Sequence, residues 1–484
     1  MTAAPEAPVV PAFRQGAWRD SLDTAPLPGS PARRLALVPE IVAHADRRWW
    51  EATGATLPPL TGRRARILAA LELFAHGTVT VGGLGPQSAA EFRTALWRSA
   101  GLPEPLVDRW CGMLREGADR REPPDPDGAL ALVALPGNTF TCLDSVLDQA
   151  ERSAAVWVRP SRREPLSAAR LVAALLAAGW PPERIGLYPG EQRALHGLVK
   201  LTDRHVVYGG AGLAASVRTA PTLTLHGPGR GCALLPPGLA TADAVAWLLP
   251  LVAADSGRFC SNVRTVVCLD PADAEPVAKA LATALDGLHP GPAPDPAARD
   301  WPLTAFRGPG EAERAAASVR GRLRPGDRLL TREPAVVPGR DGELYVRPHL
   351  VLLAGPLGTA DTAHPLVGHE VPFPFAAVLG ATADAARAVA DHSLFVHRPP
   401  GAHLPGPARP AGVSHPAGPA RGLAYPPGPL QEATHSQGPA QEATHSQEPT
   451  QGPTHSQGPV HPPGPAQPPP GSAQPPSNPP PPPP

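Results

Sequence analysis

Short apolar runs alternate with longer amphipathic segments along the middle of the chain, and this alternation constrains the fold more than any other feature. The apolar runs predict β-strands over residues 129–135, 154–158, 185–188, 205–208 and 222–225. Residues 145–152 and 167–178, which lie between these runs, have the spacing of amphipathic helices. Because strands that alternate with helices form a parallel sheet with crossover connections, we expect an α/β fold in this part of the chain.

A second α/β unit is expected over residues 241–397. It begins with a predicted helix over residues 241–254 and contains predicted strands over residues 263–269, 328–331 and 350–353. Ligands of parallel sheets collect at the carboxyl ends of the strands. We therefore expect the two lobes to enclose a cleft that holds the functional site.

The remaining segments complete the predicted domain organisation. Residues 1–45 are rich in proline and alanine, and we expect them to be irregular. A helix-rich stretch is expected over residues 43–116. Residues 46–235 are expected to form one domain from most of this helical part and the first lobe, and residues 236–397 the second lobe. The tryptophans of the helix-rich part are expected in the core rather than at a ligand; they are Trp49, Trp50, Trp97 and Trp110.

The composition changes at residue 398. Residues 398–484 hold 28 of the 70 prolines and three Thr-His-Ser-Gln repeats, which begin at Thr434, Thr444 and Thr454. Such a segment cannot bury a core, and its polyproline end favours an extended, solvated backbone. We expect a disordered tail. Docking of a proline-recognising partner is the less favoured alternative, because PxxP matches are common in such compositions.

Composition also excludes several classes of function. The 43 basic residues balance the 43 acidic ones, so no global field draws the chain to nucleic acid or to an anionic membrane. The five cysteines have neither Cys-x-x-Cys nor zinc-site spacing, so we expect no metal, and their odd number suits a reducing cytoplasm. We find no export signal and no apolar stretch of about 18 residues that could span a membrane. A cytoplasmic protein acting on a small organic molecule fits best.

Several polar residues and glycines follow predicted strands directly. The Asn138 amide after the first strand could donate to an oxyanion, although a turn asparagine is the simpler interpretation. Arg159 and Ser161 after the next strand suit ribose hydroxyls or a phosphate. Gly209 and Gly210 could let the backbone approach a pyrophosphate, although their spacing is not GxGxxG and a tight turn explains them equally well.

Cys260 is the one cysteine in a chemically suggestive position. It lies in a turn between a predicted helix and a predicted strand, beside Arg258, whose charge we expect to favour the thiolate. Cys142, Cys232 and Cys268 have apolar or glycine-rich surroundings and are expected to be inert.

Taken in order, these segments resemble the aldehyde dehydrogenase superfamily over residues 132–396. The sequence Arg159-Pro160-Ser161 replaces that family's Lys-Pro-Ser, which implies contacts to the adenosine ribose of NAD or NADP; an arginine at this position favours a 2′-phosphate or weakens binding. Pro136-Gly137-Asn138 resembles Pro-Trp-Asn, and Gly257-Arg258-Phe259-Cys260 resembles Gly-Gln-x-Cys. The resemblance implies that Asn138 is the oxyanion donor and Cys260 the nucleophile.

The resemblance extends to Glu370. The sequence from Glu370 to Pro374 is similar to Glu-x-Phe-Gly-Pro, whose glutamate holds the nicotinamide ribose. The implied fold is an aldehyde-dehydrogenase-like α/β fold, with one parallel-sheet lobe for the cofactor, one for catalysis, and the proline-rich tail.

His226 marks a departure from the family. Relatives that hydrolyse their thioester carry the glutamate of Glu-Leu-Gly-Gly-Lys at this place, whereas this chain has His226-Gly227-Pro228-Gly229-Arg230. Branches that use coenzyme A often lack the glutamate, so the departure favours reduction of an acyl-CoA to an aldehyde. A histidine can also act as a base, which leaves oxidation of an aldehyde to a carboxylic acid as the alternative.

A non-catalytic relative that acts as a binding subunit is the third hypothesis. It follows from the end of the predicted body near His397, where the family continues with further strands and an oligomerisation segment. Asn138, Cys260 and Glu370 all persist, which favours catalysis. The expected partners are a small aldehyde or acyl thioester and coenzyme A, and a homo-oligomer stays open.

Deleting the tail from about Arg398 should leave the melting temperature nearly unchanged, because its composition offers no apolar area to offset the entropy of ordering. Thermal denaturation of the full chain and the truncated chain provides the measurement. A drop of more than about 5 °C, the order expected for about 1–2 kcal/mol, would show that the tail packs on the body.

Overall fold

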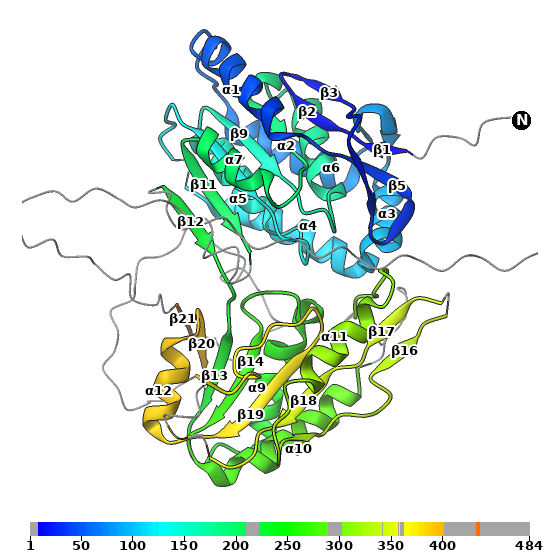
Figure 1. Ribbon diagram of the computed structural model, residues 1–484. Helices are drawn as coiled ribbons and strands as arrows, with labels where there is room; N and C mark the ends of the chain where they lie inside the picture. Colours follow the sequence, from blue (N-terminus) through cyan, green and yellow to red (C-terminus); the bar gives the residue numbers. More distant parts are fainter. Residues whose placement is uncertain are drawn as a thin grey trace, which may run out of the picture. The chain divides into compact units, whose positions relative to one another are not determined.

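The computed structural model describes residues 8–122, 124–209, 222–288, 303–340, 342–356, 358, 363–400 and 432–435. The chain divides into two compact units, Met1–Gly438 and Pro439–Pro484, and every described residue belongs to the first unit. Within this unit, two seven-stranded sheets form two α/β lobes, as the alternating pattern predicts (Figure 1).

The first sheet has the strand order β12-β11-β8-β9-β10-β2-β3. Its five parallel strands are β8 (Leu130–Ala134), β9 (Ala155–Arg159), β10 (Ile185–Leu187), β11 (Arg204–Tyr208) and β12 (Leu223–His226). All five were expected from the sequence. Strands β8 and β9 are buried at every position, and apart from Arg159 at the end of β9 they are apolar throughout rather than alternating.

Helices cover both faces of this sheet. One face packs against α2 (Arg63–His76), α3 (Ala89–Ala100), α4 (Glu104–Arg120), α5 (Leu143–Arg152) and α6 (Leu166–Ala177). The other face packs against α1 (Glu40–Gly54) and α7 (Ala194–Leu201). Smaller elements are β6 (Val79–Thr80), β7 (Pro86–Gln87) and the 3-10 helices η1 (Gly82–Leu84) and η2 (Pro182–Arg184). The buried Trp110 and Trp50 belong to this core, as expected.

The N-terminal segment is not irregular, which corrects the expectation for residues 1–45. Strands β1 (Val9–Val10), β5 (Ser30–Ala36) and β4 (Thr24–Leu27) form a small sheet, and β2 (Ala12–Arg14) and β3 (Ala17–Arg19) extend the first large sheet. The proline of β4 is tolerated because β4 is an edge strand. Buried Val10 and Phe13 offset the weak local preference for strand.

The second sheet has the strand order β15-β18-β19-β14-β13-β20-β21. Its strands are β13 (Gly231–Leu235), β14 (Val263–Cys268), β15 (Arg328–Leu329), β18 (His349–Leu352), β19 (Phe375–Gly380), β20 (Phe395–Arg398) and β21 (Glu432–His435). The expected boundary at residue 235 is wrong, because β13 pairs with β14 and β20. The second lobe therefore begins at β13.

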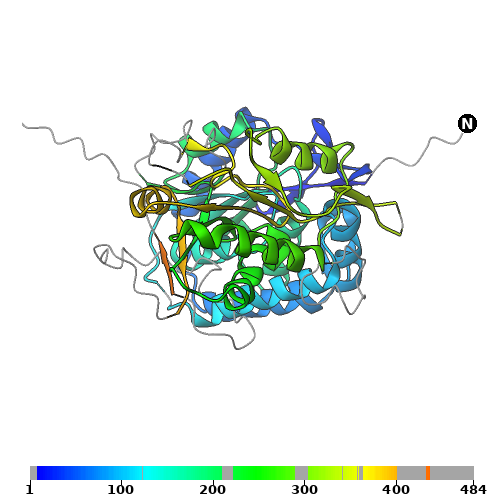
Figure 2. The ribbon, with the colours of Figure 1, turned by 90° about the horizontal axis from the view of Figure 1, so that it is seen from below.

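Helices cover both faces of the second sheet as well (Figures 1 and 2). One face packs against α9 (Thr241–Ala253) and α10 (Ala274–Asp286), and the other against α11 (Glu311–Arg320) and α12 (Ala383–Asp391). The lobe also holds the hairpin of β16 (Val336–Pro338) and β17 (Leu344–Val346), and the 3-10 helices η3 (Ala254–Gly257) and η4 (Pro271–Asp273).

One part of the predicted tail is a strand. Strand β21 pairs antiparallel with β20 at the edge of the second sheet, and β20 itself includes Arg398. The expectation that the chain from residue 398 onward packs on nothing is therefore wrong for Arg398 and for residues 432–435, and a deletion that starts at Arg398 removes this strand pair. Its sequence, Glu-Ala-Thr-His, contains no proline, so each residue can donate a ladder hydrogen bond. The prediction of disorder for residues 401–431 and 436–484 lies outside the described residues.

Candidate active site

Cys260 follows a turn with an unusual backbone. Helix α9 ends at Ala253, and Asp255, Ser256 and Gly257 then have φ values of 55°, 57° and 65°. Two non-glycine residues in the left-handed region cost on the order of 1–3 kcal/mol each, so they persist only where the surroundings hold them. Such strain is typical of functional sites.

Contacts from distant parts of the chain hold this turn. The Asp255 carboxylate accepts a hydrogen bond from Trp110 Nε1 at 2.9 Å and lies 3.2 Å from Arg109 Nε, both on α4 of the first lobe. The Ser256 hydroxyl accepts a hydrogen bond from the backbone N–H of Thr304 at 2.9 Å. The turn is therefore fixed by both lobes.

Asn262 closes the turn from its other side. Its Oδ1 accepts a hydrogen bond from the backbone N–H of Phe259 at 2.8 Å, and its Nδ2 donates to the carbonyls of Leu251 and Ala254, each at 3.1 Å. The buried amide thus satisfies carbonyls at the end of α9 that have no intrahelical partner. It also fixes the residue before Cys260.

Gly257 and Arg264 attach the turn to the segment that follows Glu370. A Cβ on Gly257 would lie 2.7 Å from the carbonyl carbon and oxygen of Phe373, so only glycine fits. The buried Arg264 guanidinium donates to the carbonyls of Phe373 at 3.1 Å, Val371 at 3.0 Å and Gly257.

The environment of the Cys260 thiol disfavours its ionisation. Cys260 is exposed, whereas the other four cysteines are buried. The surrounding protein nevertheless raises the pKa of its thiol to about 12 by withdrawing the thiolate from water, and the Glu370 carboxylate contributes by repulsion. The expectation that Arg258 favours the thiolate is wrong, because the buried Arg258 side chain donates instead to Thr304 Oγ1 at 2.9 Å and to the Asn138 carbonyl at 3.1 Å.

Asn138 lies against the Cys260 turn. Its side-chain amide donates to the Arg258 carbonyl, while Arg258 donates back to the Asn138 carbonyl. These reciprocal bonds join the carboxyl end of β8 to the residue two positions before Cys260. One N–H of the amide is thereby occupied, which leaves the other for a ligand.

Glu370 and Gly229 also lie beside Cys260. Glu370 Oε1 accepts hydrogen bonds from the backbone N–H groups of Gly229 at 2.6 Å and Arg230 at 3.4 Å. A Cβ on Gly229 would lie 1.9 Å from the Cys260 carbonyl oxygen, so the two backbones are in close contact. The structure therefore brings the motif that contains His226 to the Cys260 turn.

His226 ends β12 and is paired with Tyr208, which ends β11. The two rings are stacked, with centroids 4.4 Å apart and an interplanar angle of 10°. The Gly209 N–H donates to the His226 carbonyl at 3.1 Å, so this N–H is not directed at a pyrophosphate as the sequence suggested. Gly210 lies outside the described residues.

Arg159 and Ser161 lie at the carboxyl end of β9. The buried Arg159 guanidinium donates to the Gly190 carbonyl at 3.2 Å and Gln192 Oε1 at 3.4 Å. Burial lowers the pKa of Arg159 to about 10, and the Arg162 charge contributes. The Ser161 hydroxyl would lie 2.5 Å from a Cβ on Gly137, so the two predicted strand-end motifs are neighbours.

Sequence reasoning missed Asn262, Arg264 and Tyr208. Their roles depend on partners far along the chain, such as Phe373 for Arg264 and Ser145 for Tyr208. The only local signal is for Asn262, because an asparagine just beyond a predicted helix end is a frequent partner of free backbone groups.

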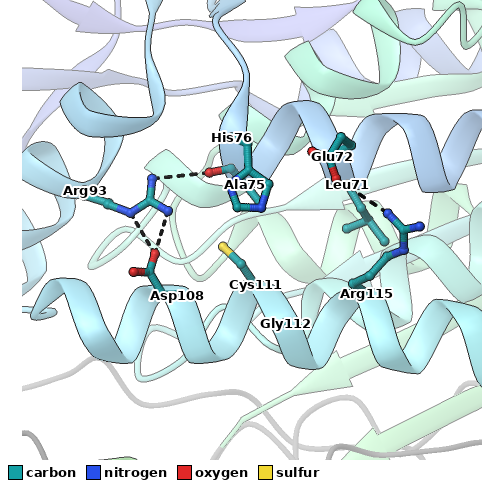
Figure 3. A pocket seen from close by; sticks show the side chains of 9 residues that line it. All are labelled: Leu71, Glu72, Ala75, His76, Arg93, Asp108, Cys111, Gly112 and Arg115. Carbon is teal, nitrogen blue, oxygen red and sulfur yellow. Dashed lines mark hydrogen bonds and ion pairs between the residues drawn. The ribbon is translucent and has the colours of Figure 1, made fainter. Parts of the chain in front are cut away.

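A pocket of about 400 Å³ lies elsewhere, on the surface of α2, α3 and α4 (Figure 3). The Cys111 thiol faces it, and burial raises the pKa of that thiol to about 12. Its charged groups pair with one another, since Arg93 binds Asp108 and Arg115 lies 3.7 Å from Glu72. No predicted site residue lines this pocket.

The described residues form neither a metal cluster nor a membrane span. No group of three or more histidine, cysteine, aspartate or glutamate side chains there could hold a metal ion. No helix in those ranges combines the length and hydropathy needed to cross a bilayer.

Gly229→Ala should displace the Cys260 turn, because its Cβ would overlap the Cys260 carbonyl. We expect the variant to lose about 1–3 kcal/mol of unfolding free energy, measured by chemical denaturation. Gly227→Ala is the matched control, since its Cβ would have no heavy atom within 4 Å, and it should change stability by less than about 0.5 kcal/mol. Equal stability of the two variants would contradict the close contact.

No protein-family model and no curated protein matches the chain in sequence. Solved structures do match in fold. A NAD-dependent benzaldehyde dehydrogenase from Corynebacterium glutamicum superimposes with a TM-score of 0.62 at 16% identity, over 81% of this chain and 88% of that one. Aldehyde dehydrogenase C from Pseudomonas syringae, solved with NAD+ and octanal, gives 0.63 at 18% identity, over 81% and 84%.

A third structure is methylmalonate-semialdehyde dehydrogenase from Oceanimonas doudoroffii, with a TM-score of 0.63 at 16% identity, over 80% of this chain and 83% of that one. The similarity covers both lobes, whose parallel sheets and paired helical layers were expected from the sequence. This chain has the aldehyde dehydrogenase fold.

Proposed function

We propose that this chain is an NAD(P)-dependent oxidoreductase that interconverts an aldehyde and an acyl thioester through an acyl-enzyme on Cys260. The observation that carries the proposal is the strained turn of Asp255–Gly257, which both lobes hold and which exposes Cys260 beside Asn138 and Glu370. Three residues with complementary chemistry meet there although they are far apart in sequence. The shared fold with NAD-dependent aldehyde dehydrogenases supports the same reaction class.

The residues at the carboxyl ends of β8 and β9 fit a dinucleotide. Arg159 Nε is buried and has no hydrogen-bond partner among the described residues, so a ligand acceptor would satisfy it. Gly137 leaves space beside Ser161 that a side chain would fill. In this proposal Arg159 and Ser161 bind the adenosine ribose or its 2′-phosphate, and Glu370 binds the nicotinamide ribose. When bound, the cofactor would supply or accept a hydride at the carbon attached to Cys260.

Cys260 needs a base. With the pKa of its thiol raised to about 12, only a minute fraction is thiolate at neutral pH. His226, which lies three residues before the Gly229 contact, is the proposed acceptor of this proton. The thiolate then attacks the acyl carbon, the second N–H of Asn138 and the Cys260 backbone N–H stabilise the oxyanion, and the leaving thiol departs protonated.

The finer proposal is reduction of an acyl-CoA to an aldehyde. Its support is the absence of a glutamate at position 226, the place from which hydrolytic relatives of this fold activate water. If the histidine accepts the proton of the Cys260 thiol and does not activate water, the acyl-enzyme is not hydrolysed. Another thiol, such as that of coenzyme A, must then accept the acyl group. Oxidation to a carboxylic acid is the competing outcome, and the experiments below separate the two.

The alkylation rate of Cys260 should depend on pH in a way set by its thiol. In His226→Gln the rate with iodoacetamide should rise about tenfold per pH unit from pH 7 to 9, because a raised pKa places this whole range below half-ionisation. The wild-type rate should exceed that of the variant at pH 7. Labelling is measured by mass of the Cys260 peptide, with Cys260→Ala as the blank. A plateau below pH 9 in the variant would contradict the raised pKa.

Aldehyde oxidation without coenzyme A should stop after one turnover. Mixing enzyme, oxidised cofactor and an aldehyde should give a burst of about one equivalent of reduced cofactor by absorbance, and adding coenzyme A should restart turnover. Cys260→Ala should give no burst while it keeps its cofactor affinity, and Cys268→Ala should behave as wild type. Steady turnover without coenzyme A would instead establish oxidation to the acid. Cofactor binding with neither burst nor turnover would favour a non-catalytic protein.

A further inference from the structure

Tyr208 is an aromatic residue beside His226 that no sequence motif explains. It ends β11 and is the register partner of His226 at the end of the neighbouring strand β12. Its ring lies parallel to the His226 imidazole, with the centroids 4.4 Å apart. A flat contact of this kind fixes both the position and the plane of the imidazole.

The Tyr208 hydroxyl is anchored on its other side. It forms a 2.7 Å hydrogen bond with the Ser145 hydroxyl, which belongs to the first turn of α5. A tyrosine held at both its face and its hydroxyl has little freedom to rotate. Through Tyr208, the position of the His226 ring therefore depends on the position of α5.

Tyr208 also lies in the neighbourhood of the nucleophile. The pKa of Tyr208 lies well above its usual value, chiefly because of burial. The charges of Cys142 and Cys260 raise it further, whereas the hydrogen bond with Ser145 lowers it. Burial and then the Cys260 charge raise the pKa of Cys142. Tyr208, Cys142 and Cys260 are therefore near enough to influence one another's ionisation, and the nearby carboxylates are Asp144, which acts on Tyr208 and Cys142, and Glu370, which acts on Cys260.

We propose that Tyr208 is a positioning residue, which holds the His226 imidazole by ring stacking in the orientation that accepts the Cys260 proton and is itself held by Ser145. The inference rests on the proposed role of His226. It deepens that role by naming the element that orients the base. Tyr208 does not exchange a proton, so its ring matters more than its hydroxyl.

The test is the rate of Cys260 alkylation by iodoacetamide in the full chain at pH 7, without cofactor. Tyr208→Met replaces the ring with a flexible apolar side chain, and it should slow alkylation about tenfold or more, as His226→Gln does. The double variant Tyr208→Met with His226→Gln should be no slower than His226→Gln alone, because the two residues act as one unit. Tyr208→Phe keeps the stack and should retain at least about a third of the wild-type rate.

Tyr188→Met is the matched control. Tyr188 is a buried tyrosine, whereas Tyr208 is partly buried; Tyr188 follows β10 in the same sheet and lies against Trp157 with ring centroids 4.4 Å apart. It should lower the melting temperature as Tyr208→Met does while leaving Cys260 alkylation unchanged. If Tyr208→Met does not fold, Tyr208→Phe and Ser145→Ala provide the test, since each removes the hydrogen bond between the two hydroxyls. Each variant should slow alkylation of Cys260 about two- to threefold. The double variant should be no slower than either single variant.

The inference is overturned if Tyr208→Met alkylates at the wild-type rate while His226→Gln is slow, or if the two effects multiply. It is also overturned if Tyr208→Phe is as slow as Tyr208→Met. If His226→Gln itself leaves alkylation unchanged, the base is misassigned and Tyr208 loses its role, whereas Cys260 as nucleophile is judged separately by the burst of reduced cofactor.

Discussion

The turn from Asp255 to Gly257 is the constraint on which the rest of the candidate site depends. Its left-handed backbone is unfavourable for Asp255 and Ser256 and is maintained by hydrogen bonds from Trp110 and Thr304. Because Trp110 belongs to the core of the first lobe, the position of Cys260 is tied to the packing of both lobes. The stability of the fold thereby offsets the backbone strain in the turn that exposes Cys260.

The same turn determines which charged side chains act on the Cys260 thiol. Arg258, the cation nearest in sequence, is drawn away to Asn138 and Thr304, and Arg264 is occupied by three backbone carbonyls. Near the thiol, the Glu370 carboxylate opposes ionisation and outweighs the Arg264 charge, which favours it. A thiol that rests protonated is protected from oxidation but depends on a base. This dependence gives His226 and the ring beneath it their proposed importance.

The sequence predicted the sheets better than the site. Strands such as β8 and β9 are buried on both faces, and continuous apolar runs reveal them directly. The N-terminal strands were missed because Pro26 and the surrounding alanines carry a weak local signal, and their pairing depends on β10 and β5. The motif residues Asn138, Cys260 and Glu370 were found in the right neighbourhood, but their hydrogen bonds were not.

Those bonds join residues that are distant in the chain, so no local pattern reports them. The Arg258 side chain looked like an activator of Cys260 because the two are adjacent in sequence, yet its partners lie on the other lobe and at Thr304. Asn262 and Tyr208 were missed for the same reason. Backbone strain at Asp255 is equally invisible, since its φ is imposed by Trp110 rather than preferred by aspartate.

The proposed function requires that an acyl group becomes attached to Cys260. The most direct measurement is the intact mass of the full chain after mixing with an acyl-CoA in the absence of reduced cofactor, followed by peptide mapping. The account predicts one added acyl mass, located on the peptide that contains Cys260 and released by coenzyme A. An unmodified chain for every acyl-CoA tried, or an acyl group located on Cys111 or Cys142 instead, would contradict it.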